Sequence, residues 1–428
     1  MKFKTRYFVK SCLVLTMLTL YLYVFHYKKY GLENFQCPLN LIHKCAQIFK
    51  DKPYWKQIVS NGRSIYFYKA FFDSNIGRIK IVALVQKNST YTNLRCRLNN
   101  SITSFASVEE ASSPYDYENT ERKSAYVSCD FKLNTNIYMS NLTLTLNDEE
   151  SSEIIVGSSP KKVKLSDRRP LICVRPMFGP FDDINMLIEF IAFYTANGIR
   201  DFVFFDFMTS YRVLDFLSNV RTVNISVFRW NIEYIDDSIE SNGQLAAQMF
   251  CLEEYRDYVL IYVDFDEYLV IQDTFFMSYN RPSLTLVNFI EQHKISNTAV
   301  IRIRNTFFCD KCFQSFRRGI KILSNFEQQQ CIWKDQRTKM IILHPECIEF
   351  SQVHFISKFS DKCKDITPEV IADPKEILMH HYRNCYDVPT PTYCNSIRNL
   401  LEENNSMLKY SEQIKYHIYL LRKSDITY

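Results

Sequence analysis

The stretch that decides the fold is Val259-Leu260-Ile261-Tyr262-Val263-Asp264-Phe265-Asp266-Glu267-Tyr268, an apolar run that ends in three carboxylates. A run rich in Val, Ile and Tyr predicts a buried strand. Open α/β sheets bind their ligands outside the carboxyl ends of the strands. Carboxylates at such an end are hard oxygen ligands, which a divalent cation takes together with phosphate oxygens. The stretch therefore predicts an α/β sheet with a cation site at its edge.

The spacing of the two aspartates supports this prediction. Residues i and i+2 of an extended segment point the same way, so Asp264 and Asp266 would converge while Phe265 packs behind them. Two carboxylates on one face repel each other unless a cation lies between them. An isolated Asp-x-Asp sequence is more often a solvated acidic turn, and it is the preceding strand and the flanking pattern that favour the cation site here.

Strands and helices alternate around this stretch. The expected strands are 171–175, 201–206, 225–230 and 299–304, and the expected helices are 185–196, 211–218 and 243–256. This alternation predicts a mostly parallel, Rossmann-like sheet with helices on both faces. Its carboxyl edge would gather Arg175, Asp206, Asp264 and Asp266 in one crevice.

An uncharged apolar segment runs from Cys12 to Phe25. With its flanks it provides about 20 residues, enough to cross a bilayer. A cleaved signal peptide is the alternative, but no small-residue cleavage site follows, and the first alanine is Ala46. Lys and Arg are denser before the segment than after it. This bias predicts a cytosolic tail (1–10), a transmembrane signal anchor (11–27) and a luminal remainder.

Two further features indicate the secretory pathway. Glycosylation acceptors of the form Asn-x-Ser/Thr occur at Asn88, Asn99, Asn141, Asn224 and Asn404. The chain has 14 cysteines, 13 of them beyond the anchor, which favours structural disulfides in an oxidising lumen. An odd number leaves at least one thiol free, buried or paired between chains, and the connectivity stays open. A zinc half-site or redox motif at Cys309 and Cys312 is the less favoured alternative.

Composition divides the luminal part into segments. A short stem (28–60) precedes a β-rich section (61–147) without catalytic motifs, a polar linker (148–169), the α/β domain (170–385) and a helical extension (386–428). The net charge of +5 is spread along the chain without dense Lys/Arg blocks, so nucleic acid is not expected as a partner. Homo-oligomerisation stays open.

The motifs between residues 170 and 385 resemble glycosyltransferase family 92, nematode type. The resemblance rests on 172–179, 187–190, 197–199, 243–247 with Cys251-Leu252, 263–268, 339–342 before Pro345, His354, and 381–383. It implies a type II Golgi membrane enzyme of the GT-A fold. Such an enzyme uses Mn²⁺ or another divalent cation and transfers a hexose, expected to be galactose, from a UDP-sugar to a glycan acceptor with inversion. Met249, Phe250 and Ala192 depart from the pattern and put the donor sugar and acceptor in doubt.

The resemblance also implies roles for particular residues. Asp264, Asp266 and His381 are the expected metal ligands, with Asp264 on metal-bound water or the ribose. His354 and His380 are weaker candidates for the third ligand. The expected donor contacts are Arg175, Asp206, Gln244, Asp264 and Arg383, of which Arg383 would pair with phosphate. For Arg175, Asp206 and Gln244, a structural role at a strand end or helix cap is an equal alternative.

Inversion requires a base that deprotonates the acceptor hydroxyl, and a carboxylate usually fills this role. Glu327 and Asp335 are the acids in the segment before Lys339, although no motif singles out either, and both can be plain surface charges. A rival hypothesis is an inactive, membrane-anchored glycan-binding or scaffold protein on the same fold. Paired carboxylates at a strand end argue against it, because a chain without catalysis has no need of them.

Overall fold

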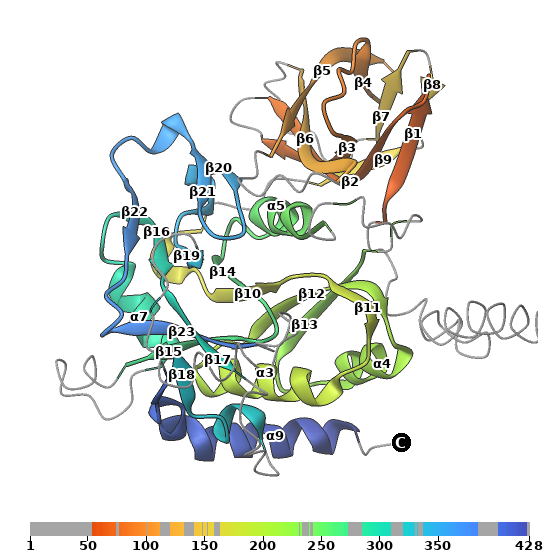
Figure 1. The fold of residues 1–428 in the computed structure, drawn as a ribbon. Coiled ribbons are helices and arrows are strands. Elements are labelled where there is room, and N and C mark those ends of the chain that lie inside the picture. The colour runs from red at the N-terminus through yellow and green to blue at the C-terminus, as the bar shows by residue number, and fades with distance from the viewer. Residues whose placement is uncertain are drawn as a thin grey trace, which may run out of the picture.

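The computed structural model describes residues 54–73, 77–99, 101–111, 120–131, 141–147, 149–151, 153–157, 163–230, 232, 239, 243–272, 285–309, 320–329, 332, 337–383 and 401–425. A β-rich unit lies above an α/β unit (Figure 1). The predicted tail, anchor and most of the stem fall outside the described residues. No helix within the described ranges is long and apolar enough to cross a bilayer.

The β-rich unit is one sheet that runs in the order β1-β2-β3-β6-β5-β4-β7-β8. β9 pairs with both β2 and β7, which lie near opposite ends of this order, and so links the two sides of the sheet. A disulfide between Cys96 and Cys129 joins β4 to β6. The strands are β1 Lys56–Ser60, β2 Arg63–Asp73, β3 Arg78–Gln86, β4 Leu94–Leu98, β5 Ile102–Glu110, β6 Arg122–Asp130, β7 Asn141–Leu146, β8 Glu149–Glu150 and β9 Ile154–Gly157. The first half of the predicted linker thus pairs into this sheet, as does the end of the predicted stem.

The α/β unit is built on a second sheet, in the order β11-β12-β10-β14-β19-β16-β22. β13 also pairs with β12, on the edge opposite β10. β10 through β14 pair in parallel, while β19 is antiparallel to β14 and β16. The strands are β10 Pro170–Val174, β11 Met177–Phe181, β12 Asp201–Thr209, β13 Asn224–Arg229, β14 Val259–Val263, β16 Thr298–Ile303, β19 Lys339–Ile342 and β22 Thr367–Ile371.

Successive residues of the parallel strands enter two different cores. On β10, Ile172 packs with the helices on one face, while Leu171 packs into the cluster on the other. Because a strand alternates its side chains, a continuous apolar strand buries both faces of its sheet. The predicted mostly parallel sheet with both faces covered is confirmed, with β19 as an antiparallel strand within it.

α3 and α4 cover one face of this sheet, α7 belongs to the same core, and α9 packs on the outer side of α3, while α5 covers the other face (Figure 1). Side chains of Asp183 and Ser210 cap the starts of α3 and α4, and Gly198, with a φ of 89°, follows the end of α3. The helices are α3 Ile184–Ala196, α4 Tyr211–Asn219, α5 Gln244–Glu254, α7 Leu286–His293 and α9 Ser411–Asp425. The 3-10 turns are η2 Leu165–Asp167, η4 Lys321–Leu323, η6 Pro345–Cys347, η7 Asp361–Cys363 and η10 Ser406–Tyr410.

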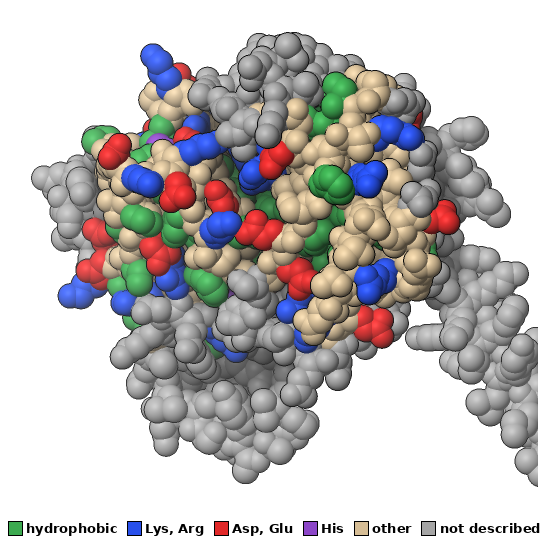
Figure 2. Space-filling model, turned by 90° about the horizontal axis from the view of Figure 1, so that it is seen from above, with side chains coloured by type: hydrophobic (Ala, Val, Ile, Leu, Met, Phe, Trp, Pro, Cys, Tyr) green, Lys and Arg blue, Asp and Glu red, His purple; other side chains and the backbone are tan. Residues whose placement is uncertain are grey.

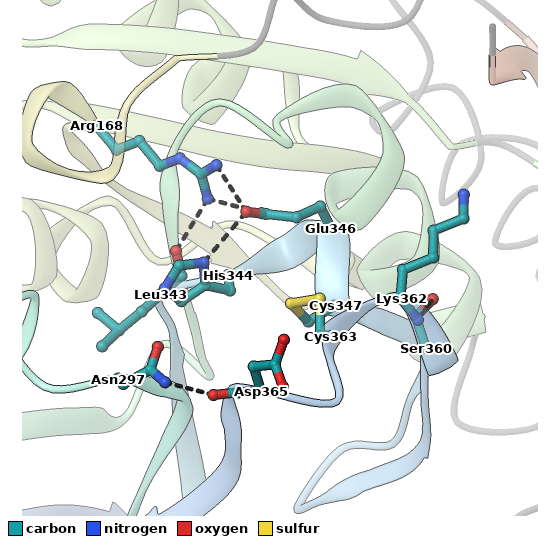
Figure 3. Close-up of a disulfide and its surroundings, with 10 residues drawn as sticks. All are labelled: Arg168, Asn297, Leu343, His344, Glu346, Cys347, Ser360, Lys362, Cys363 and Asp365. Atoms are coloured by element: carbon teal, nitrogen blue, oxygen red, sulfur yellow. Dashed lines mark hydrogen bonds and ion pairs between the residues drawn. A yellow bond between two sulfur atoms is a disulfide. The ribbon is translucent and has the colours of Figure 1, made fainter. Parts of the chain in front are cut away.

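A third sheet continues from β14 and has the order β15-β23-β17-β18-β24. Its strands are β15 Glu267–Ile271, β17 Asn305–Cys309, β18 Glu327–Gln329, β23 Ile377–Arg383 and β24 Leu401–Glu403. A separate hairpin, β20 Ile348–Ser351 with β21 Ile356–Phe359, is flanked by the disulfide Cys347–Cys363. Beside this disulfide, Glu346 accepts hydrogen bonds from Arg168 Nη1 (2.8 Å) and Nη2 (2.9 Å) (Figure 3).

The β-rich unit packs directly on α5. The Tyr68 ring lies 4.6 Å from that of Trp230 between centroids, the Phe71 ring lies 6.0 Å from that of Phe250, and the Tyr126 hydroxyl donates to the Met249 carbonyl. Met249 and Phe250, which depart from the family pattern, are therefore buried against the β-rich unit. The outer face of the molecule on this side mixes Lys/Arg with Asp/Glu (Figure 2).

Candidate active site

The two aspartates lie in a tight turn between β14 and β15. The Glu267 amide donates to the Asp264 carbonyl (3.2 Å), so Phe265 and Asp266 occupy the middle of the turn. The expected extended segment is wrong, because the chain leaves one sheet after Val263 and enters another at Glu267. Phe265 is nevertheless buried behind the turn, where its ring lies 5.0 Å from that of Phe181.

Asp264 contacts three side chains from three different elements. Its Oδ1 accepts a hydrogen bond from Gln244 Nε2 at the start of α5 (2.9 Å). Its Oδ2 lies 3.3 Å from Lys339 Nζ of β19 and 3.8 Å from Arg175 Nη1, just after β10. The structure thus brings Arg175, Gln244 and Asp264 together at the carboxyl ends of neighbouring strands. Two cations and an amide offset the charge of Asp264.

Asp266 faces His381 of β23. His381 Nε2 lies 3.3 Å from Asp266 Oδ2, and His381 Nδ1 lies 3.6 Å from Glu267 Oε1. Burial raises the pKa of Asp266, but the hydrogen bond and charge of His381, together with the charge of Arg175, outweigh this effect and hold the pKa below its usual value. Burial likewise lowers the pKa of His381, and the carboxylates of Asp266 and Glu267 reverse the shift, so it ends above its usual value.

The pair Asp266 and His381 fits a divalent cation. Adjacent ligand atoms around an octahedral ion with bonds of about 2.1 Å lie about 3 Å apart, close to the 3.3 Å between Oδ2 and Nε2. Asp266 is also one-third exposed, so ligands from solution can reach it. Within the described ranges, no three His, Cys, Asp or Glu side chains are arranged to hold a metal. The remaining ligands would be water and substrate oxygens, as is usual for Mg²⁺-like sites.

Asp206 is placed differently from the other expected donor contacts. It is buried within the second half of β12, and its Oδ1 accepts from the Thr209 amide (3.0 Å) past Met208, whose φ is 69°. Burial raises the pKa of Asp206, and the hydrogen bonds of Thr209 oppose the rise only in part. These contacts favour the structural alternative, because the carboxylate stabilises the strained backbone at Met208 near the end of the strand.

The other histidines lie away from the Asp266 carboxylate. His380 is fully buried on the opposite side of β23, its ring 4.5 Å from that of Phe308, and burial lowers its pKa to about 3. His354 Nδ1 lies 3.1 Å from the Thr338 carbonyl, and burial together with Lys339 lowers its pKa to about 4. His381 is therefore the histidine that the structure places beside the Asp266 carboxylate.

The expected base and phosphate contacts are only partly described. Asp335 lies outside the described residues. Glu327 and Arg383 are described as backbone: Glu327 begins β18, and Arg383 ends β23 opposite Cys309 of β17. β17 pairs with both strands, so Glu327 and His381 lie in one sheet.

Two residues of the site were missed as functional candidates. Glu267 is buried beneath the turn, and its Oε2 lies 2.9 Å from Lys339 Nζ. Lys339 is itself almost fully buried. Both belong to motifs of the family resemblance: Glu267 is the third carboxylate of 263–268, and Lys339 begins the apolar run 339–342. A lysine that opens a buried strand is the signal that could have singled out Lys339, because burying its charge requires partners.

The predicted acceptor asparagines and disulfides are also placed. Asn88, Asn99, Asn141 and Asn224 are exposed, while Asn404 is half-buried and accepts from the Ser406 amide (2.9 Å). A third disulfide, Cys173–Cys251, ties β10 to α5. The prediction of structural disulfides is confirmed for these three pairs. Cys312 lies outside the described residues, and Cys309 is described only as backbone.

Comparison with known families agrees with this layout. Residues 168–418 match the family model of glycosyltransferase family 92, which makes the protein a glycosyltransferase. The match covers more than half of the chain. The chain therefore belongs to glycosyltransferase family 92, as predicted. It extends past the expected boundary at residue 385 and includes much of α9, which packs along α3. No curated protein sequence matches the chain.

Proposed function

We propose that the protein is a metal-dependent, inverting hexosyltransferase of GT-A type that transfers galactose from UDP-galactose to a glycan acceptor. The observation that carries the proposal is the cluster at the carboxyl ends of β10 and β14. There, Asp266 and His381 offer two ligand atoms 3.3 Å apart, and Arg175 lies 3.8 Å from Asp264. Cation ligands beside an exposed guanidinium fit a diphosphate better than a neutral sugar.

The side chains divide this work among themselves. Asp266 and His381 would hold Mn²⁺, which when bound stabilises the charge that develops on the leaving diphosphate. Arg175 is partly exposed and can pair with a phosphate oxygen once a donor enters. Phe178 is also partly exposed, with its ring 5.6 Å from the Arg175 guanidinium, and offers a flat surface to a base or sugar. Gln244 and Lys339 orient Asp264 from below.

The acceptor side is assigned to the third sheet. Inversion requires a base on the face of the sugar opposite UDP, and a carboxylate usually fills this role. We assign the base to Glu327 or Asp335, and Glu327 has the support that its strand belongs to the sheet of His381. The N-terminal apolar segment, the five acceptor asparagines and the disulfides support a type II Golgi membrane protein with a luminal catalytic domain.

The test is a donor screen on the full-length chain in detergent. The protein is incubated with UDP-galactose, UDP-glucose, UDP-N-acetylglucosamine and UDP-N-acetylgalactosamine, each with Mn²⁺ and a glycan mixture, and released UDP is measured. Release from UDP-galactose alone, abolished by a chelator, supports the proposal. Release from another donor overturns the galactose assignment while leaving the reaction class intact.

The inactive-scaffold alternative has its own outcome in the same experiment. A scaffold would release no UDP with any donor, yet would bind glycans on an array. Asp266→Asn is the matched control, because a genuine transferase should lose UDP release in this variant, whereas glycan binding by a scaffold should not change.

A further inference from the structure

Glu267 is a buried hub between the two halves of the site. Its Oε2 accepts a hydrogen bond from the Asp264 amide (2.7 Å) and lies 2.9 Å from Lys339 Nζ. Its Oε1 lies 3.6 Å from His381 Nδ1. The side chain is 2% exposed, so these groups, and not water, surround it. One carboxylate therefore touches the Asp264 end of the turn and the histidine of β23 together.

Lys339 completes the hub from the neighbouring strand. β19 runs antiparallel to β14, with Met340 opposite Tyr262, which places Lys339 level with the end of β14. Its Nζ lies 2.9 Å from Glu267 and 3.3 Å from Asp264 Oδ2, and the residue is 1% exposed. Both of these carboxylates offset the charge of the ammonium, since an isolated buried ammonium would be strongly unfavourable.

Stability alone is a poor reason for this arrangement. A buried ion pair is often no more stabilising than well-packed apolar residues of the same volume. This pair lies directly beneath the turn, and each of its members contacts a residue of the site: Lys339 contacts Asp264, and Glu267 lies on the Nδ1 side of His381. A carboxylate on that side of a histidine leaves the other ring nitrogen for a metal.

We infer that Glu267 and Lys339 are positioning residues, a buried ion pair that fixes Asp264 and His381 for cation and nucleotide binding. The inference rests on the proposed function. Lys339 holds the Asp264 carboxylate toward Arg175 and Gln244, while Glu267 orients the imidazole so that Nε2 faces Asp266. Because both side chains are almost fully buried, we assign neither of them a contact with the reacting groups.

The experiment uses the full-length chain in detergent and measures the affinities for Mn²⁺ and for UDP in the presence of Mn²⁺, by calorimetry. The key variant is Glu267→Gln/Lys339→Met, which removes both charges and leaves neither stranded. We expect the dissociation constant for Mn²⁺ to rise 10-fold or more, as for other residues that orient metal ligands. The melting temperature without metal should fall no further than in the control variant.

The control is Glu346→Gln, which breaks the ion pair with Arg168 in the same unit but away from the turn. It should lower the melting temperature and leave Mn²⁺ affinity unchanged. If the double variant fails to fold, Glu267→Gln alone makes the comparison, because Lys339 keeps Asp264 as a partner. Wild-type affinity in a folded variant overturns the positioning role. If the wild type itself binds neither Mn²⁺ nor UDP, the proposed function fails together with this inference. That result differs from wild-type affinity in the variant, which overturns the inference alone.

Discussion

At the residue scale, the site is a balance of charges in a small volume. Asp264, Asp266 and Glu267 contribute three carboxylates within one turn, and Lys339 and Arg175 contribute two fixed cations. His381 can add a third positive charge, since its neighbours hold its pKa above the usual value. A divalent cation at Asp266 and His381 therefore competes with the proton on the imidazole, because a histidine ligand must be unprotonated.

The first prediction concerns Asp266→Asn. The variant should lose transfer activity and the rise in melting temperature that Mn²⁺ gives the wild type, because an amide is a weaker ligand and carries no charge. Removing a carboxylate from a cluster could relieve repulsion, but Asp266 pairs with His381 at 3.3 Å. We therefore expect no gain in metal-free melting temperature. Thermal unfolding with and without Mn²⁺ measures both effects, and normal turnover by folded protein would reject the metal role of Asp266.

The second prediction compares two adjacent histidines. His381→Ala should raise the Mn²⁺ concentration needed for half-maximal activity about 10-fold or more. His380→Phe should leave that concentration unchanged, because His380 points into the apolar core against Phe308. Activity titrated with Mn²⁺ decides between them. Equal titration curves for the two variants would show that His381 is not a metal ligand.

At the element scale, sequence patterns specified the sheet better than the site. Runs such as 259–263 and 201–206 contain enough information to predict a strand buried on both faces, although β12 continues to Thr209. Met249 and Phe250 could not be placed in this way, since only the fold shows that α5 is covered by the β-rich unit. Likewise the turn at Asp264 depends on the chain moving between two sheets, and the contacts of Lys339 depend on the register of β19 against β14. Local periodicity does not contain such long-range pairings.

The third prediction concerns the hairpin of β20 and β21 and its anchor at Glu346. Burial raises the pKa of Glu346, but hydrogen bonds from His344 and Arg168 outweigh it and lower the pKa to about 2, below the ordinary 4.5. The pair is therefore fully stabilising above pH 4.5, and its contribution disappears as the pH falls toward 2. Glu346 is 41% exposed, so Glu346→Gln should cost only about 1 kcal/mol at pH 7. Denaturant unfolding should show that the difference in free energy of unfolding between the wild type and Glu346→Gln becomes smaller from pH 4.5 to pH 3. A difference that does not change with pH would exclude the ion pair as its cause.

At the scale of the whole molecule, the β-rich unit and the α/β unit share one apolar core. The shared cluster includes Tyr68 and Tyr126 from the β-rich unit, Phe250 from α5, and Phe350 from the hairpin. Ion pairs surround this core: Lys69 with Glu254, Lys80 with Glu253, and Lys358 with Glu109. α5 therefore lies between the two units, and its first residue, Gln244, contacts Asp264. The β-rich unit supports the helix from which the site is partly built.

The last prediction follows from this shared core. A chain that begins at residue 163 keeps every described residue of the α/β unit but exposes the apolar face of α5, including Met249 and Phe250. An exposed patch of that kind causes aggregation or unfolding. With the same cleavable signal peptide fused in front of each chain, we expect this chain to be retained as aggregate or to lack a cooperative thermal transition. A chain that begins at residue 54 should be secreted and melt in one transition. Secretion from cultured cells and calorimetry compare the two. If the shorter chain is soluble, folded and binds Mn²⁺ and UDP like the longer one, then the β-rich unit is a separable appendage, and the contact between Gln244 and Asp264 does not depend on it.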